Sequence, residues 1–101
     1  MRMLMHVRFP IEPFNSALRD GTAGAKIQRI MESIKPEAAY FTDEDGMRGG
    51  TLVVNVNDSS EIPALAEPFF LTFEAEVKFG VAMTPEDLGK SGLEALGKKW
   101  G

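Results

Sequence analysis

The sequence predicts an α+β fold in the order β-α-β-β-α-β, followed by a further helix toward the C-terminus. Along the chain the spacing of hydrophobic residues changes from two, which is typical of strands, to 3.6, which is typical of helices, and back again, twice. Each predicted strand has one apolar side. Proline, glycine and acidic residues stand between these segments, where turns and helix starts are expected.

The first strand is predicted at residues 3–9 and the first helical region at residues 14–34. In the strand Met3, Met5, Val7 and Phe9 fall on the core side, while Leu4, His6 and Arg8 fall on the other side. The helical region changes phase, which predicts a short helix near 13–19, a break at Gly21 and a second helix near 23–35. Thr22 is the expected N-cap of the second helix, and Pro36 is expected to end it.

A β-hairpin and a helix follow. Residues 38–42 form the predicted second strand, residues 43–46 an acidic turn, and residues 51–57 a third strand whose start is left open as far back as Met47. Hydrophobic residues at helical spacing over residues 62–69 predict the next helix, with Ser60 as N-cap and Pro63 in the first turn. Pro68 is expected to shorten or kink its far end.

The fourth strand is predicted at residues 74–83, with Val81 and Met83 among its core-facing residues. Thr84 and Asp87 are spaced as a capping box around a proline, which predicts a further, glycine-interrupted helix. The whole order corresponds to a ferredoxin-like βαββαβ fold, a four-stranded antiparallel sheet with helices on one face plus a C-terminal helix. The first and third strands are expected at its centre.

Length and composition indicate one globular domain over residues 1–101. Hydrophobic residues make up 44% and charged residues 26% of the 101, which excludes a disordered tail, a collagen and a coiled-coil rod. A compact domain of this length has a radius of gyration of about 13 Å.

Several functional classes are excluded by residue counts. The sequence has no cysteine and one histidine, so a thiolate nucleophile, a cysteine-based metal site and a multi-histidine metal site in one subunit are ruled out. A net charge of −4 without a basic cluster argues against nucleic-acid binding. No apolar run suits a membrane span and the first residues do not resemble a signal peptide, so we expect a cytoplasmic protein without a cofactor.

The sheet face opposite the helices mixes apolar and polar groups. It is expected to carry these residues: Leu4, His6, Arg8, Ala38, Tyr40, Thr42, Thr51, Val53, Asn55, Glu74, Glu76 and Lys78. An antiparallel sheet can leave such a face in water. The alternative is a homodimer in which two such faces enclose a cavity.

This second alternative agrees with a family resemblance. The order of elements, the size, the mixed sheet face and the capped C-terminal helix ending Leu96-Gly97-Lys98-Lys99-Trp100 resemble the dimeric α/β-barrel superfamily. Residues 14–24, 40–42 and 66–70 also resemble a group of small bacterial proteins with this plan. The superfamily includes cofactor-independent monooxygenases and muconolactone-isomerase-like proteins. The resemblance implies a homodimer with a pocket, and because it rests on no catalytic motif it implies no particular reaction.

His6 is the candidate catalytic residue, because its imidazole is the one side chain of the sequence suited to exchange a proton near neutral pH. It would act as a general base, with Glu76 or Asn55 orienting it. The alternative is a hydrogen-bonded interface histidine.

The candidate ligand-binding residues are Arg8, Tyr40, Asn55, Glu76 and Lys78. Arg8 and Lys78 would bind an anionic substrate, or they would pair with Glu74 and Glu76 on neighbouring strands. Tyr40 would donate a hydrogen bond to a ligand, or pack at a dimer seam. Trp100, beside two lysines, either caps a neighbouring subunit or lies in a frayed tail.

Three functions are compatible with these residues, and the sequence leaves open whether the protein is an enzyme. The first is a homodimer that binds a small organic ligand on the free sheet face. The second is a cofactor-independent monooxygenase or isomerase that uses His6. The third is a protein-interaction module that docks through the same face.

Overall fold

The computed structural model describes all residues 1–101 and confirms the predicted α+β fold. Its elements are β1 (Arg2–Arg8), α1 (Ile11–Arg19), α2 (Ala23–Ile34), β2 (Ala38–Glu44), β3 (Met47–Asn55), a 3₁₀ turn (Ser59–Glu61), α3 (Ile62–Phe73), β4 (Glu76–Val81), α4 (Pro85–Lys90) and α5 (Leu93–Trp100). The third strand thus begins at Met47, the earlier of the two starts that the sequence left open.

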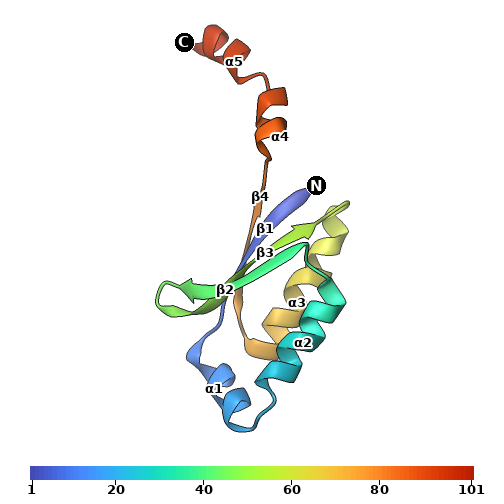
Figure 1. Cartoon of the computed structure of the whole chain (residues 1–101), viewed down its shortest axis with the longest axis vertical. Helices are drawn as coiled ribbons and strands as arrows, with labels where there is room; N and C mark the ends of the chain where they lie inside the picture. The colour runs from blue at the N-terminus through green and yellow to red at the C-terminus, as the bar shows by residue number, and fades with distance from the viewer.

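The four strands form one antiparallel sheet in the order β2-β3-β1-β4. As predicted, β1 and β3 lie at the centre and β2 and β4 at the edges. Helices α2 and α3 lie side by side on the same side of the sheet, as Figure 1 shows. The opposite side, which we call the open face, is not covered by any helix.

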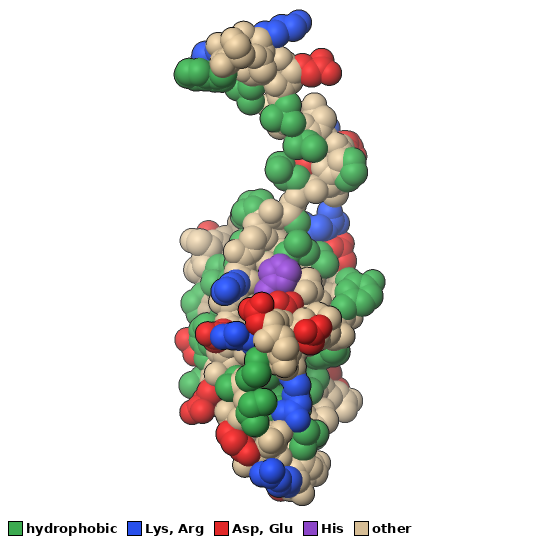
Figure 2. Space-filling view, turned by 90° about the vertical axis from the view of Figure 1, so that its left-hand side faces the viewer, with side chains coloured by type: hydrophobic (Ala, Val, Ile, Leu, Met, Phe, Trp, Pro, Cys, Tyr) green, Lys and Arg blue, Asp and Glu red, His purple; other side chains and the backbone are tan.

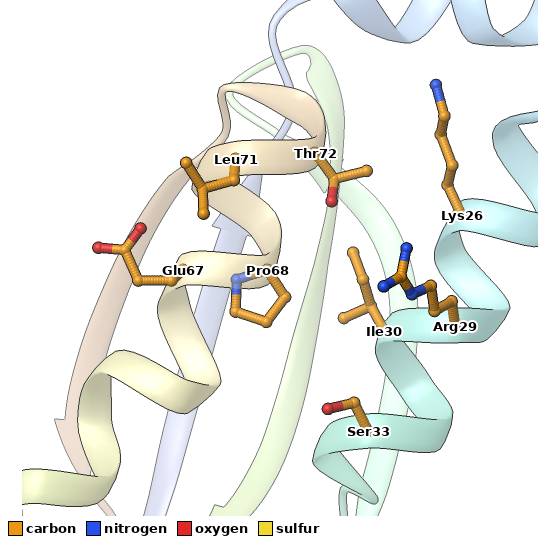
Figure 3. A pocket seen from close by; sticks show the side chains of 8 residues that line it. All are labelled: Lys26, Arg29, Ile30, Ser33, Glu67, Pro68, Leu71 and Thr72. Carbon is orange, nitrogen blue, oxygen red and sulfur yellow. The ribbon is translucent and has the colours of Figure 1, made fainter.

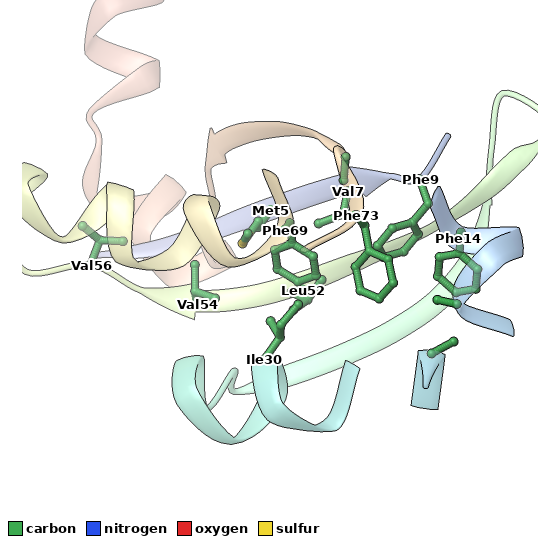
Figure 4. Close-up of a cluster of buried hydrophobic side chains, with 13 residues drawn as sticks. Met5, Val7, Phe9, Phe14, Ile30, Leu52, Val54, Val56, Phe69 and Phe73 are labelled. Atoms are coloured by element: carbon green, nitrogen blue, oxygen red, sulfur yellow. The ribbon is translucent and has the colours of Figure 1, made fainter. Parts of the chain in front are cut away.

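The core lies between the sheet and α1 to α3, and its largest members are aromatic (Figure 4). Met5 and Phe73 are fully buried, and Phe69 and Leu52 are each only 1% exposed. The rings of Phe14 and Phe73 stack with their centroids 5.0 Å apart. The core sides predicted for β1 and β3 are therefore correct.

Helix starts differ in part from the prediction. The Thr84 side chain accepts from the backbone N–H of Asp87 and the Asp87 side chain accepts from that of Thr84, so the predicted capping box is present. Thr22 stands at the start of α2, but its hydroxyl donates to Asp20 and caps nothing. Asp58 caps the 3₁₀ turn before α3 by accepting from the backbone N–H of Ser60, so Ser60 is not the N-cap that the sequence predicted.

The end of α2 and the two prolines of α3 can be compared with the prediction in the same way. Lys35 takes a left-handed conformation and ends α2 one residue before Pro36. Pro63 lies in the first turn of α3, and the helix continues past Pro68 to Phe73. Pro68 therefore does not shorten this helix.

The fourth strand is shorter than predicted at both ends. Glu74 adopts a left-handed conformation (φ 53°) that ends α3, so it lies outside the sheet and not on the open face. At the other end Val81 and Met83 are 60% and 62% exposed, so their predicted place in the core is wrong. The last residue pair between β4 and β1 joins Val81 to Met3, and no helix covers the chain beyond it.

The C-terminal arm, residues 85–101 with α4 and α5, stands away from the body of the protein (Figure 1). Every residue of this arm is exposed. The molecule consequently measures 59 × 28 × 19 Å, with a radius of gyration of 17.0 Å instead of the 13 Å expected for a compact chain. None of its helices, in the arm or in the body, has the length and apolar composition needed to cross a membrane.

Candidate functional site

The strand register brings one row of polar side chains together on the open face. His6 in β1 lies between Thr51 in β3 and Lys78 in β4. Tyr40 in β2 pairs with Thr51 and extends the row to the sheet edge, where it is 70% exposed. Paired residues of antiparallel strands point to the same side of a sheet, so each of the four strands contributes one side chain to this row.

His6 is held through one of its two ring nitrogens. Its Nδ1 lies 3.1 Å from Thr51 Oγ1 and 3.8 Å from Glu44 Oε1. Nε2 makes no hydrogen bond within the chain. When Nδ1 carries the hydrogen, Nε2 presents a free lone pair, which is the arrangement that a proton-accepting histidine requires.

Glu44 reaches His6 because Gly49 has no side chain. Glu44 belongs to the edge strand β2 and lies near the hairpin turn. A Cβ atom built on Gly49 would lie 2.5 Å from Glu44 Cγ and 2.5 Å from the carbonyl oxygen of Val7. The carboxylate chain of Glu44 therefore occupies the space over Gly49.

The neighbouring row contains an ion pair. Arg8 donates to Glu76 on β4, which lies directly opposite it in the register, and Asp45 Oδ2 lies 3.8 Å from Arg8 Nη1. The predicted pairing of Arg8 with Glu76 is thus present, and a pairing with Glu74 is not. Lys78 forms no ion pair and is the unpaired cation of the group.

These side chains surround a small hollow on the open face. It is lined by His6, Val7, Arg8, Glu44, Asp45, Glu76 and Lys78 and has a volume of about 30 Å³. Figure 2 shows acidic and basic side chains gathered around the histidine on this surface. A volume of this size holds about one water molecule. The hollow of a single chain is therefore too small for an organic ligand.

An apolar row borders the hollow. Leu4 and Val53 are half-buried and face each other across β1 and β3, with Ala38 beside them on β2. Gly80 fills the fourth place of the row, and a Cβ built there would meet no atom within 4 Å. The open face thus has an apolar half next to a charged half.

Asn55 is not part of this group. It pairs with Arg2, whereas His6 pairs with Thr51, four residues away along β3. Four strand residues correspond to about 13 Å, which excludes Asn55 as the orienting partner of His6. Arg2 itself donates to Glu37, and this hydrogen bond lowers the pKa of the Glu37 carboxyl. Glu76 is likewise engaged by Arg8 and does not orient His6.

Three members of the group were not among the predicted site residues. Thr51 was placed on the open face but given no role, and Glu44 and Asp45 were assigned only to a turn. The one sequence signal for the approach of Glu44 was Gly49, which follows the acidic turn. A glycine in a strand allows a neighbouring segment of the chain to approach closely.

A larger groove of about 570 Å³ lies on the other side of the molecule, between α2 and α3 (Figure 3). Lys26, Arg29 and Ser33 line it from α2, and Glu67 and Leu71 line it from α3. The protein has no buried polar or charged residue, so this groove has no recessed polar group to orient a ligand. No three histidine, aspartate or glutamate side chains come together to hold a metal ion anywhere in the chain.

Comparisons with known proteins extend to the fold and no further. No protein-family model matches the chain, and no curated protein matches its sequence. A solved structure of 5-chloro-2-hydroxyhydroquinone dehydrochlorinase from Burkholderia phenoliruptrix, in complex with 2,5-dihydroxybenzoquinone, is similar with a TM-score of 0.60. The match covers 85% of this chain and 97% of that chain at 15% sequence identity. At this identity the likeness shows a shared fold.

Proposed function

We propose that the protein is a homodimer that binds a small aromatic ligand bearing ionisable oxygens in a cavity on the open face. The observation that carries this proposal is the pairing of an unpartnered cation, Lys78, with a histidine whose Nε2 is free, in one row of the sheet. Both residues lie on the open face by the strand register, and no helix of the same chain covers this face (Figure 1).

The two halves of the open face suit two parts of such a ligand. Leu4 and Val53 offer apolar contact to a flat ring, and the missing side chain at Gly80 leaves room beside them. Lys78 supplies a donor for an oxygen that carries negative charge, and the free Nε2 of His6 accepts a hydrogen bond from a hydroxyl group of the ligand. The quinone in the similar solved structure combines a flat ring with hydroxyl and carbonyl oxygens in the same way.

A second copy is required because one chain does not enclose a cavity. The hollow beside His6 holds about one water molecule, whereas small-molecule sites bury most of the ligand surface in a few hundred Å³. In a dimer whose two open faces are related by a twofold axis, the hollow of each copy would lie against apolar surface of the other copy.

A second function, general acid–base catalysis by His6, is favoured by one specific contact. Hydrogen bonding of Nδ1 to Thr51, with the Glu44 carboxylate 3.8 Å away, orients the ring and leaves Nε2 directed away from these partners. The reaction would then be a proton transfer in an isomerisation, an elimination or a cofactor-independent oxidation.

The test uses 2,5-dihydroxybenzoquinone as the probe, with calorimetric titration and sedimentation of the full chain. We expect a dimer that binds the probe. Lys78→Met should weaken binding tenfold or more, because it removes a charge-assisted hydrogen bond worth about 1.5–3 kcal/mol. The matched control is Lys26→Met in the groove between α2 and α3, which should leave the affinity unchanged.

Two further results distinguish the functions. On the binding function His6→Asn should change the affinity by about the value of one hydrogen bond, roughly 1 kcal/mol. On the catalytic function the same substitution should reduce turnover about a hundredfold or more. A monomer that does not bind the probe, or equal binding by the Lys78 variant, would contradict the proposal.

A further inference from the structure

The C-terminal arm is an element without a partner in its own chain. Leu88, Leu93, Leu96 and Trp100 are 43%, 54%, 44% and 77% exposed, and α4 and α5 stand away from the sheet and its covering helices (Figure 1). Figure 2 shows apolar side chains recurring along the arm up to the C-terminus. Isolated helices shorter than about 12 residues are marginal in water, so helices of six and eight residues require apolar contact elsewhere.

The connection between β4 and α4 directs the arm away from its own sheet. Thr84 is extended (φ −74°, ψ 164°), and the proline that follows it disfavours any helical backbone at this position. The capping box then fixes the start of α4 immediately after this extended residue. The chain therefore continues in the direction of β4 and does not return across the open face (Figure 1).

We propose that the arm of one copy lies along the open face of a second copy, so that Trp100 covers the hollow around the partner's His6. This inference rests on the homodimer of the proposed function and adds which segment closes the site. In a symmetric dimer each copy would cover the other, an exchange of identical elements that leaves no arm exposed.

The dimensions and the distribution of charge agree with this arrangement. Helix α5 has eight residues and is about 12 Å long. The rows of Leu4 and Arg8 are four strand residues apart, about 13 Å. Leu93 at one end of α5 would thus lie above the apolar row, with the ligand's ring between them, when the other end lies over the charged half.

The basic end of the arm complements the acidic end of the open face. Lys98 and Lys99 precede Trp100, and the Lys99 ammonium lies 5.3 Å from the centre of the indole ring. Asp45, whose side chain is 84% exposed, and Glu44 lie at the hairpin end of the open face. The two lysines would face the carboxylates of Asp45 and Glu44. The indole of Trp100 would lie between these carboxylates and the apolar row.

Trp100 is the one tryptophan of the sequence, so its fluorescence reports on the arm alone. We would measure its emission maximum in the full chain over a dilution series, beside sedimentation of the same samples. We expect short-wavelength emission in the dimer, and a shift to the emission of the urea-unfolded chain on dilution to monomer.

Two substitutions locate the docking surface. Gly80→Lys places a charge on the apolar row in open space, so it does not disturb the fold of one chain. It should shift the Trp100 emission to longer wavelength at concentrations where the original chain is a dimer. Leu71→Lys, at an 81% exposed position on α3, is the matched control and should leave the emission unchanged.

The outcomes separate this inference from the proposed function. A dimer whose Trp100 emission equals that of the unfolded chain would overturn the arm exchange and leave the homodimer intact. A monomer with exposed Trp100 would overturn both. Short-wavelength emission in a monomer would show the arm folded on its own chain and would overturn the exchange. A shift with Leu71→Lys and none with Gly80→Lys would place the arm in the groove between α2 and α3 and overturn the proposed location.

Discussion

Replacement of Gly49 by alanine should destabilise the protein, whereas the same replacement at Gly80 should not. Both glycines lie in strands and face the same side of the sheet. At Gly49 the new Cβ would lie 2.5 Å from the backbone oxygen of Val7, closer than Cβ atoms approach any group, so the central strands must move apart. At Gly80 the new Cβ meets nothing within 4 Å.

The two substitutions are expected to change the free energy of unfolding in opposite directions. Forcing an extra methyl group into a packed position costs about 1–3 kcal/mol. For a domain of this size each kcal/mol lowers the melting temperature by about 4–8 °C. At Gly80 alanine reduces the chain entropy lost on folding and should stabilise by roughly 0.5–1 kcal/mol.

Thermal unfolding followed by circular dichroism measures both variants under one set of conditions. Gly49→Ala combined with Glu44→Ala separates the two closest contacts, because it removes the Cγ of residue 44 and leaves the Val7 oxygen at 2.5 Å and the Cβ of residue 44 at 3.0 Å. We expect the double variant to regain part of the lost stability. Equal melting temperatures for Gly49→Ala and Gly80→Ala would refute the reasoning that Gly49 is required by close approach.

Three other predictions concern the core, a helix and the arm. Phe73→Ala should cost about 3–5 kcal/mol in the free energy of unfolding measured with urea, because the ring is fully buried; a loss below 1 kcal/mol would mean that the aromatic core is loose. Gly24→Ala, in α2 with open space around the new Cβ, should raise the melting temperature, since alanine is favoured over glycine in a helix by about 1 kcal/mol. The backbone N–H of Thr84 donates to the Asp87 carboxylate and lowers its pKa. The stabilisation of helix α4 by this carboxylate is therefore complete above the usual aspartate pKa of about 3.9, and it is lost as the pH falls through the lower pKa of Asp87 in the folded protein. NMR chemical shifts of α4 should show this loss of helix over an acid titration, and a helix content of α4 that does not change while the Asp87 carboxyl becomes protonated would contradict it.

The order of elements was predictable because each strand and helix in the body buries one face in the same core. The spacing of Met5 and Val7 in one strand, and of Leu52 and Val54 in another, already separates the core side from the open face. The open face followed from the same alternation. These are local signals, and they agree with one another along the chain.

The contacts within the candidate site were less predictable, because they depend on how two strands align. A register shift of two residues would bring Val53 or Gly49, instead of Thr51, opposite His6, and the sequence does not state the register. The approach of Glu44 to His6 depends on an absent side chain at position 49 in another strand.

The exposure of the end of β4 and the placement of the arm away from the body were unpredictable for a different reason. The alternation that predicted Val81 and Met83 in the core is a correct reading of their polarity, but nothing in their own chain covers them. Hydrophobic spacing gives the polarity of a residue, and it does not indicate whether another element of the chain covers it.

The position of β4 in the sheet has a consequence for the synthesis of the protein on the ribosome. His6 lies in the first strand and Lys78 in the last, and β4 is the partner of one edge of β1. Until residues 76–81 have left the ribosome, β1 is an unpaired edge with free backbone groups, and the row around His6 lacks its cation. At about 5–20 residues per second this interval lasts several seconds, during which the nascent chain is open to pairing with other strands. The open face is thus completed only once residues 76–81 have emerged, and a chain interrupted before them has neither the four-stranded sheet nor the site.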